Sequence, residues 1–187
     1  MQFHHHPWNG LRFWDLVQPY FMFIVGVAIP FSVAKRRERG QSERDIRAHA
    51  IRRALLLLLI GWALYCIDPG RITFRFQNVL AQLSVTYTVA FFLMNRSWRT
   101  QIAWSVAFIA VAELLYRVFW VAGFDQPFTP DQNFGAWFDL LISGELSGGH
   151  WVSFNAIPTT AHTIWGVVVG QLLRSDRSER DKLKPLL

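Results

Sequence analysis

The sequence predicts an all-α protein, a polytopic transmembrane helical bundle of about five spans. Of its 187 residues, 52% are hydrophobic and 16% aromatic, and they form long continuous runs rather than amphipathic stretches. The net charge is +6, and most of the charged residues lie between those runs. Charge segregated in this way is typical of membrane topology, so we do not expect a nucleic-acid partner.

Five segments have about the length of roughly 20 residues that a helix needs to cross a bilayer. We expect spans at 13–34, 50–67, 77–94, 102–124 and 154–173. They must be helices because lipid satisfies no open backbone group, and the runs are too continuous for alternating barrel strands. No removable signal peptide is expected before the first span, since residues 1–12 lack a short apolar core and a small-residue cleavage site.

The positions of Lys and Arg predict how these spans cross the membrane. Fifteen of them fall on one side: Lys35, Arg36, Arg37, Arg39, Arg44, Arg47, Arg52, Arg53, Arg96, Arg99, Arg174, Arg177, Arg180, Lys182 and Lys184. The other side holds Arg12, Arg71 and Arg75. The positive-inside rule therefore places the C-terminus in the cytoplasm and the N-terminus outside.

The loop between the fourth and fifth spans, residues 125–153, contains no Lys or Arg and is long enough to suggest a function. Within it, residues 133–143 have the pattern of a short interfacial helix. We expect one transmembrane domain over residues 1–173 and a basic cytoplasmic tail over 174–187. The single cysteine, Cys66, has no internal partner for a disulfide.

Polar residues at membrane depth are costly and usually face the bundle interior or a wet cavity. Asn78, Gln82 and Thr86 recur at four-residue steps in the third span. In the fifth span, a similar stripe runs from Asn155 through His162 to two glycines. Together the stripes suggest a shared polar cavity, for chemistry or for transport.

Each polar feature also has a purely structural explanation. Gly166 and Gly170 form a small-xxx-small pattern that favours close helix packing. Glu113 and Arg117 have the spacing of an intrahelical ion pair. For His162, a hydrogen bond across helices is favoured over a direct role in a site.

The N-terminus carries three adjacent histidines, His4, His5 and His6, with Asp15 at the start of the first span. Neighbouring side chains diverge, so the run is a poor metal site and we expect no metal. A general base oriented by a nearby carboxylate is the better functional interpretation. A solvated interfacial loop anchored by tryptophans is the structural alternative.

Three blocks of the sequence resemble the heparan-α-glucosaminide N-acetyltransferase family of polytopic membrane acyltransferases. Residues 5–11 read His-His-Pro-Trp-Asn-Gly-Leu and precede Asp15, which matches the family pattern His-x-Pro-Trp-x-Gly followed by Asp. Residues 78–87 and the helix that begins at Asn155 resemble two later family blocks. The family's span before the histidine motif and its later spans are not found here, so we expect a partial or shortened chain. In the second block, Asn78, Ala81 and Gln82 replace the family's Gly, Gln and Arg.

The resemblance implies an integral membrane acyltransferase that moves acetyl from cytoplasmic acetyl-CoA to an amino-sugar or glycan amine at the outer face. It implies catalytic roles for His5 and Asp15. Substrate binding would fall to Trp8, Asn9, Gln82, Asn155 and His162. The bacterial inner membrane is the expected location, and a homo-oligomer is left open. The alternatives are a transporter subunit and a non-catalytic membrane fragment.

Overall fold

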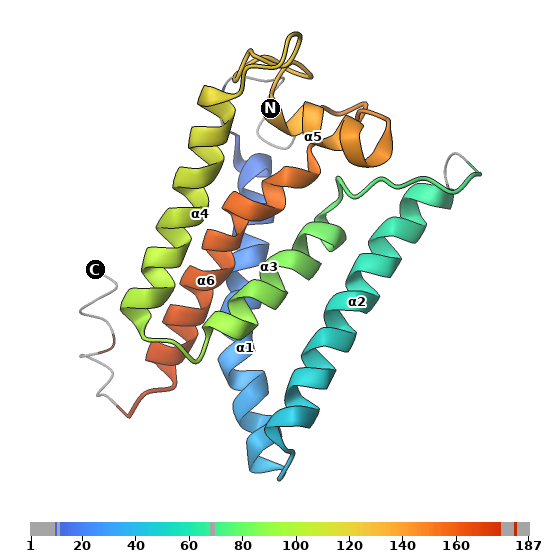
Figure 1. Ribbon diagram of the computed structural model, residues 1–187. Coiled ribbons are helices and arrows are strands. Elements are labelled where there is room, and N and C mark those ends of the chain that lie inside the picture. The colour runs from blue at the N-terminus through green and yellow to red at the C-terminus, as the bar shows by residue number, and fades with distance from the viewer. Residues whose placement is uncertain (1–9, 11, 68–69, 177–181, 183–187) are drawn as a thin grey trace.

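The computed structural model describes residue 10, residues 12–67, residues 70–176 and residue 182. Every regular element in this part of the chain is helical. The elements are η1 (Phe13–Leu16), α1 (Val17–Glu38), α2 (Glu43–Ile67), α3 (Val79–Leu93), α4 (Trp98–Val118), α5 (Phe134–Ser143), η2 (Ser153–Asn155) and α6 (Ala156–Leu173). The prediction of an all-α bundle is confirmed (Figure 1).

Three helical segments of the described chain are long and apolar enough to cross a membrane: 13–38, 43–67 and 98–118. Their outer faces carry large apolar side chains, among them Leu55, Leu59 and Leu64 of α2 and Leu114 of α4, each about half exposed. In water such faces would be large exposed patches, whereas in a bilayer they contact lipid. The chain is therefore an integral membrane protein.

The fourth predicted span is shorter than expected. Helix α4 ends at Val118 rather than near 124, because Phe119 turns into an extended conformation. The Phe119 ring packs on Phe134 and Trp137 of α5, with ring centroids 5.0 and 4.8 Å apart. Aromatic packing across the loop thus ends the helix within a continuous apolar run.

The first two helices extend beyond their predicted spans through charged turns. Helix α1 continues to Glu38 and α2 begins at Glu43, where Ser42 Oγ accepts a hydrogen bond from the Asp45 backbone N–H. A serine in this position satisfies an otherwise unpaired helix amide. Helix α3, with 15 residues, spans about 22 Å at 1.5 Å per residue and is shorter than the hydrocarbon core.

The short helix in the long loop is confirmed as α5, which lies across one end of the bundle (Figure 1). Asn133 caps it by accepting a hydrogen bond from Ala136 N–H, and Gly144 ends it in the left-handed conformation, with φ 69°. Both are common helix boundary signals.

Helices α1 and α6 approach each other very closely along a line of glycines. A Cβ atom built on Gly26 would lie 2.1 Å from the Thr163 carbonyl oxygen, and one on Gly166 would lie 2.1 Å from that of Phe23. Gly170 makes a similar approach to Val27. The interpretation of Gly166 and Gly170 as a packing motif is confirmed.

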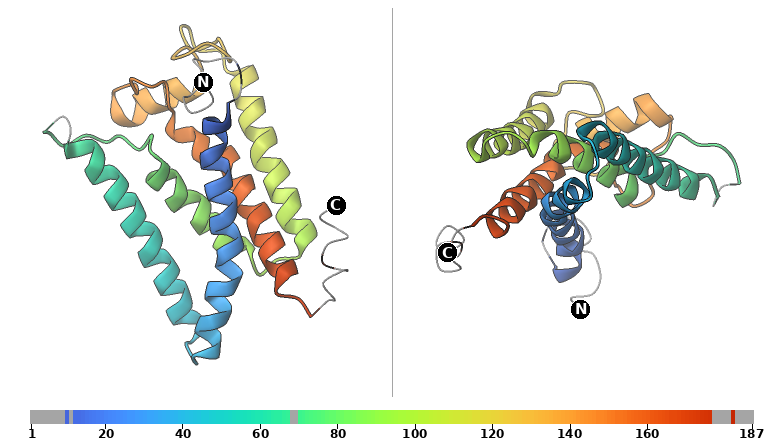
Figure 2. Two further views of the ribbon diagram at one scale, coloured as in Figure 1. Left: turned by 180° about the vertical axis from the view of Figure 1, so that it is seen from behind. Right: turned by 90° about the horizontal axis from the view of Figure 1, so that it is seen from below.

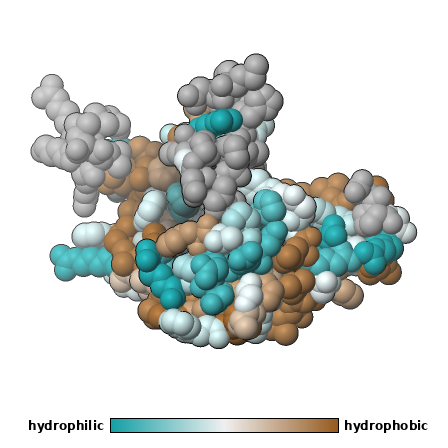
Figure 3. All heavy atoms as spheres, turned by 90° about the horizontal axis from the view of Figure 1, so that it is seen from above, coloured by the Kyte–Doolittle hydropathy of each residue, from teal (hydrophilic) through white to brown (hydrophobic). Residues whose placement is uncertain are grey.

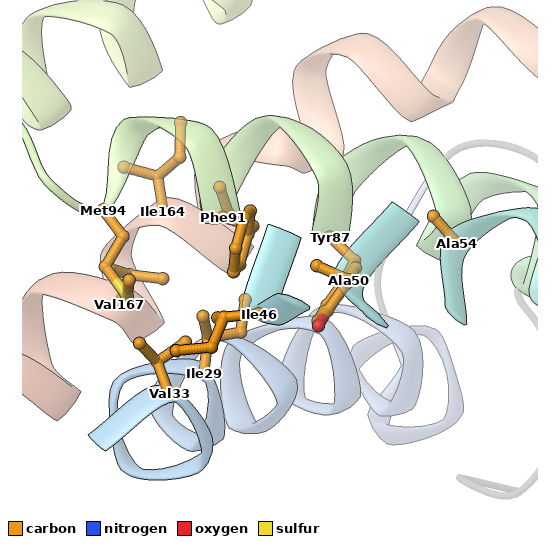
Figure 4. Close-up of a cluster of buried hydrophobic side chains, with 11 residues drawn as sticks. Ile29, Val33, Ile46, Ala50, Ala54, Tyr87, Phe91, Met94, Ile164 and Val167 are labelled. Carbon is orange, nitrogen blue, oxygen red and sulfur yellow. The ribbon is translucent and has the colours of Figure 1, made fainter. Parts of the chain in front are cut away.

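Helix α6 lies at the centre of the bundle and packs on α1, α3 and α4, while α2 packs mainly on α3 and diverges from α1 beyond their shared loop (Figures 1 and 2). A hydrophobic core forms where α1, α2, α3 and α6 meet, with Ile29, Ile46, Phe91 and Ile164 at its centre (Figure 4). The loops 39–42 and 94–97 and the end of α6 share one end of the bundle, which we call the basic end (Figure 1).

Candidate active-site cavity

A cavity of about 410 Å³ lies at the end of the bundle away from the basic end. It is lined by Trp14, Val17, Gln18, Phe21, Tyr65, Gln77, Asn78, Val79, Gln82 and Trp151. These residues come from the start of α1, the end of α2, the start of α3 and the loop before η2. Viewed from this end, hydrophilic residues are interspersed with hydrophobic ones across the molecule (Figure 3).

The α1 wall of the cavity begins at the turn that contains Asp15. The Asp15 carboxylate accepts a hydrogen bond of 2.8 Å from the Arg12 backbone N–H, while the Asp15 N–H donates to the Arg12 carbonyl at 3.0 Å. This reciprocal cap fixes how the chain enters the helix. Trp14 and Gln18, on either side of Asp15, both line the cavity.

The α3 wall begins at Asn78, which caps the helix and joins it to α2. Its side-chain oxygen accepts from Ala81 N–H at 2.9 Å, and its amide donates to the Gly61 carbonyl at 3.0 Å. A Cβ on Gly61 would lie 2.5 Å from that same Asn78 oxygen, so the contact requires glycine. Because Asn78 is the cap, α3 begins at Val79 and not at the predicted residue 77.

Gln82 connects the two walls. The Gln18 side-chain amide donates to Gln82 Oε1 at 2.6 Å, and Gln82 is 4% exposed. A buried amide such as that of Gln82 is expensive at membrane depth unless it is fully hydrogen bonded, and such groups often mark functional sites. Gln82, which we predicted from the sequence as a substrate-binding residue, therefore lies on the cavity wall.

Gln77 is a cavity residue that the sequence did not indicate. It is 4% exposed, and within the described part of the chain neither atom of its side-chain amide has a hydrogen-bond partner. A buried amide without partners carries a desolvation cost that a polar ligand would relieve. Trp151 and Tyr65 are also lining residues that have no signal in the sequence pattern.

Behind Gln77 lies Asp139 of α5, which is almost fully buried. Both of its carboxylate oxygens accept from the Ser153 backbone N–H at 3.1 Å. Burial raises the pKa of Asp139, and the hydrogen bonds from Ser153 oppose that rise. The carboxylate thus holds the start of η2 and positions the loop that carries Trp151.

Two predicted substrate-binding residues do not belong to the described cavity lining. Asn155 is the last residue of η2, and its carbonyl accepts from Thr159 Oγ1 at 2.6 Å. The His162 ring packs against Trp165 at 5.3 Å, and Trp165 donates to Ser105 of α4, so this pair faces α4. His162 Nδ1 is buried and has no hydrogen-bond partner among the described residues.

The remaining predicted residues, His5, Trp8 and Asn9, lie outside the described residues. The same holds for His4 and His6, so the expectation of no metal at the histidine run stays a prediction. Within the described segments, no three His, Cys, Asp or Glu side chains gather as metal ligands would.

The loop between α5 and η2 adds a further histidine next to the cavity. His150 Nδ1 lies 2.7 Å from Asp131 Oδ2, and both residues have the unusual φ of 59°. Non-glycine residues rarely adopt this conformation, so the surrounding loops must hold the pair in place. His150 immediately precedes Trp151 and thereby ties the cavity rim to residue 131.

Comparison with known proteins adds a family match over nearly the whole chain. Residues 2–186 match the family described as "Heparan-alpha-glucosaminide N-acetyltransferase, catalytic". The mouse protein named heparan-alpha-glucosaminide N-acetyltransferase is 36% identical over 102 residues, 52% of this chain and 16% of that protein. The human protein of the same name is 38% identical over 92 residues, 46% of this chain and 14% of that protein. The chain thus matches only about one-sixth of the length of these curated relatives.

Proposed function

The chain belongs to the heparan-alpha-glucosaminide N-acetyltransferase catalytic family, and we propose that it acts as a membrane-bound N-acetyltransferase. The donor in this proposal is acetyl-CoA from the cytoplasm, and the acceptor is an amino sugar or a glycan amine at the outer face. One observation carries the proposal: residues of two separate family blocks line a single cavity. Trp14 and Gln18 flank the motif aspartate, and Asn78 and Gln82 come from the second block.

The chemistry of these side chains suits acetyl transfer. The acceptor amine attacks the thioester carbonyl, forming the C–N bond and then breaking the C–S bond. His5 takes the proton that the amine loses, and the departing CoA thiolate is protonated in turn. Alternatively, His5 first receives the acetyl group and then passes it to the amine. Asp15 would orient and charge-balance His5, which lies ten residues earlier in the chain.

Side-chain amides have a separate role in this proposal. An amide N–H directed at the thioester oxygen stabilises the negative charge that develops there, and the amides of Gln77 and Gln82 lie around the cavity. Tryptophans such as Trp14 and Trp151 offer flat apolar faces to a sugar ring, while the polar amides bind its hydroxyl groups.

Acetyl transfer in proteoliposomes tests the proposal. The purified chain would receive radiolabelled acetyl-CoA and glucosamine, and His5→Ala would be compared with the adjacent control His4→Ala. Loss of general-base catalysis predicts a drop of roughly 100-fold to 10,000-fold for His5→Ala and little change for His4→Ala. Acetyl label trapped on wild-type protein without acceptor would indicate the acetyl-histidine route.

The same vesicles separate the competing functions. Glucosamine flux without acetyl-CoA would indicate a transporter, and absence of both flux and transfer would indicate a non-catalytic fragment. Transfer unchanged by His5→Ala would contradict the proposed chemistry.

We also propose a bacterial inner membrane location with the cavity end outside. Support comes from the placement of both basic loops at the other end of the bundle. An impermeant reagent added to intact cells should label a cysteine at position 148 and not one at position 41; the reverse pattern would contradict this orientation.

A further inference from the structure

A second groove, of about 350 Å³, lies at the basic end of the bundle and is independent of the proposed active site. Its floor is apolar, with Val33, Ile46, Phe91, Phe92 and Met94. Its rim is polar, with Arg37, Glu43, Arg47, Asn95 and Arg96. The groove thus joins the end of α1, the start of α2 and the turn between α3 and α4.

The rim carries more positive than negative side chains. Within the described segments, no acidic side chain pairs with the surplus arginines. Arg37 is paired with Glu43 through two hydrogen bonds, of 2.6 and 3.1 Å. In the described segments, Arg47 and Arg96 form no side-chain hydrogen bond or salt bridge, and Arg47 contributes only a longer-range attraction to Glu43. Two guanidinium groups therefore remain available for an anion.

The backbone that carries Arg96 is firmly held. The fully buried Gln101 donates to the carbonyls of Met94, at 3.2 Å, and Arg96, at 2.9 Å. Gln171 of α6 donates to the same Met94 carbonyl at 2.5 Å. This side of the groove is thus preorganised by contacts with α4 and α6, which lowers the cost of binding a ligand.

The groove also lies where a lipid headgroup would be. Trp98, 60% exposed, begins α4 directly after the turn, and exposed tryptophans concentrate at membrane interfaces. Phe92, 50% exposed, belongs both to the groove and to the apolar outer surface of α3. A molecule whose phosphate meets the arginines can therefore extend an acyl chain past Phe92 into the bilayer.

We propose that this groove binds an anionic phospholipid, with the headgroup phosphate between Arg47 and Arg96 and an acyl chain beside Phe92. The two unpaired arginines are opposite in charge to the phosphate, and both can donate hydrogen bonds to its oxygens. The apolar floor and its continuity with the outer surface of α3 favour a lipid over a soluble phosphate compound.

Native mass spectrometry of the detergent-purified chain with phosphatidylglycerol tests this site. Each arginine near a membrane surface contributes roughly fivefold to the binding of an anionic lipid. We therefore expect the Arg47→Gln/Arg96→Gln double variant to bind phosphatidylglycerol about twenty-five-fold more weakly than wild type. Phosphatidylcholine should bind weakly to both proteins. Circular dichroism would show that the variant keeps its helices, since both side chains are exposed.

The matched control is Arg44→Gln/Arg52→Gln, which removes two exposed arginines of α2 that are not in the groove. It should bind phosphatidylglycerol within about twofold of wild type. An equal loss in both double variants would show general charge attraction and overturn the site. Displacement of the lipid by free CoA, dependent on Arg47 and Arg96, would assign the groove to a soluble phosphate compound and also overturn it.

Discussion

The side-chain amide of Gln18 on α1 donates a 2.6 Å hydrogen bond to the amide oxygen of Gln82 on α3. The two residues are 64 positions apart in sequence, and both line the cavity at the end of the bundle away from the basic loops. This bond holds the helix that follows the histidine motif against the helix of the second family block. It therefore connects the two parts of the proposed active site.

A double-mutant cycle on this pair should show that the two amides stabilise each other. Either Gln18→Leu or Gln82→Leu alone leaves a partly or fully buried amide without its partner, whereas the double variant removes both. Interhelical hydrogen bonds in membranes couple by about 0.6 kcal/mol on average and up to about 1.7 kcal/mol. Thermal unfolding of the four proteins in detergent gives the coupling energy; strictly additive losses would contradict a direct bond.

Gly26→Ala should strongly destabilise the bundle, because the new methyl group would lie 2.1 Å from the Thr163 carbonyl oxygen. That oxygen belongs to the backbone of α6, so the two helices would have to separate. Forcing extra atoms into packed interiors typically costs about 1–3 kcal/mol. The measurement is the unfolding temperature in detergent.

The matched control for this substitution is Gly148→Ala, because a methyl group there has no neighbour within 4 Å. It should leave the unfolding temperature nearly unchanged. Equal stability of Gly26→Ala and Gly148→Ala would show that α1 and α6 are not in close contact.

These helix contacts also show how far the sequence could predict the fold. Apolar run length was enough to predict all five bundle helices and α5, because bilayer thickness and backbone hydrogen bonding leave few alternatives. The predicted end of α4 was about six residues too late, because the packing of Phe119 on α5 is a tertiary contact without a local sequence signal.

The candidate site was only partly predictable for a similar reason. Gln82 was found because a polar residue in an apolar helix is costly and therefore conspicuous. Gln77 and Trp151 lie in loops, where polar and aromatic residues are ordinary, and only the fold brings them to the cavity. His162 and Gly170 are eight residues apart in α6. Eight residues of an α-helix make two full turns plus about 80°, so the two residues face different neighbours.

Asp139 should make stability depend on pH. Burial raises the pKa of this carboxyl group in the folded protein above its ordinary value of about 4. As pH rises from about 4 through the raised pKa, the Asp139 carboxyl group loses its proton in the unfolded protein before it does so in the folded protein. The free energy of unfolding therefore falls. Asp139→Asn should remove this contribution, keep an acceptor for Ser153 N–H, and match or exceed wild-type stability at pH 7.

Unfolding temperatures of wild type, Asp139→Asn and Asp139→Ala between pH 4 and pH 8 check this prediction. The alanine variant loses the acceptor for Ser153 and should be less stable than the asparagine variant across the range. If the unfolding temperature of wild type rose further above that of Asp139→Asn as pH increased, the folded protein would stabilise the carboxylate. That result would contradict this account.

The central claim is tested most directly by asking whether the acceptor sugar protects the cavity from chemical labelling. In a Cys66→Ser background, Val79→Cys places a thiol on the cavity wall, and Gly148→Cys places one on the exposed loop outside it. Glucosamine should slow labelling of Cys at position 79 by an impermeant maleimide in proteoliposomes and leave labelling at position 148 unchanged. Equal labelling rates at position 79 with and without saturating glucosamine, in protein that transfers acetyl groups, would contradict the assignment of this cavity as the acceptor site.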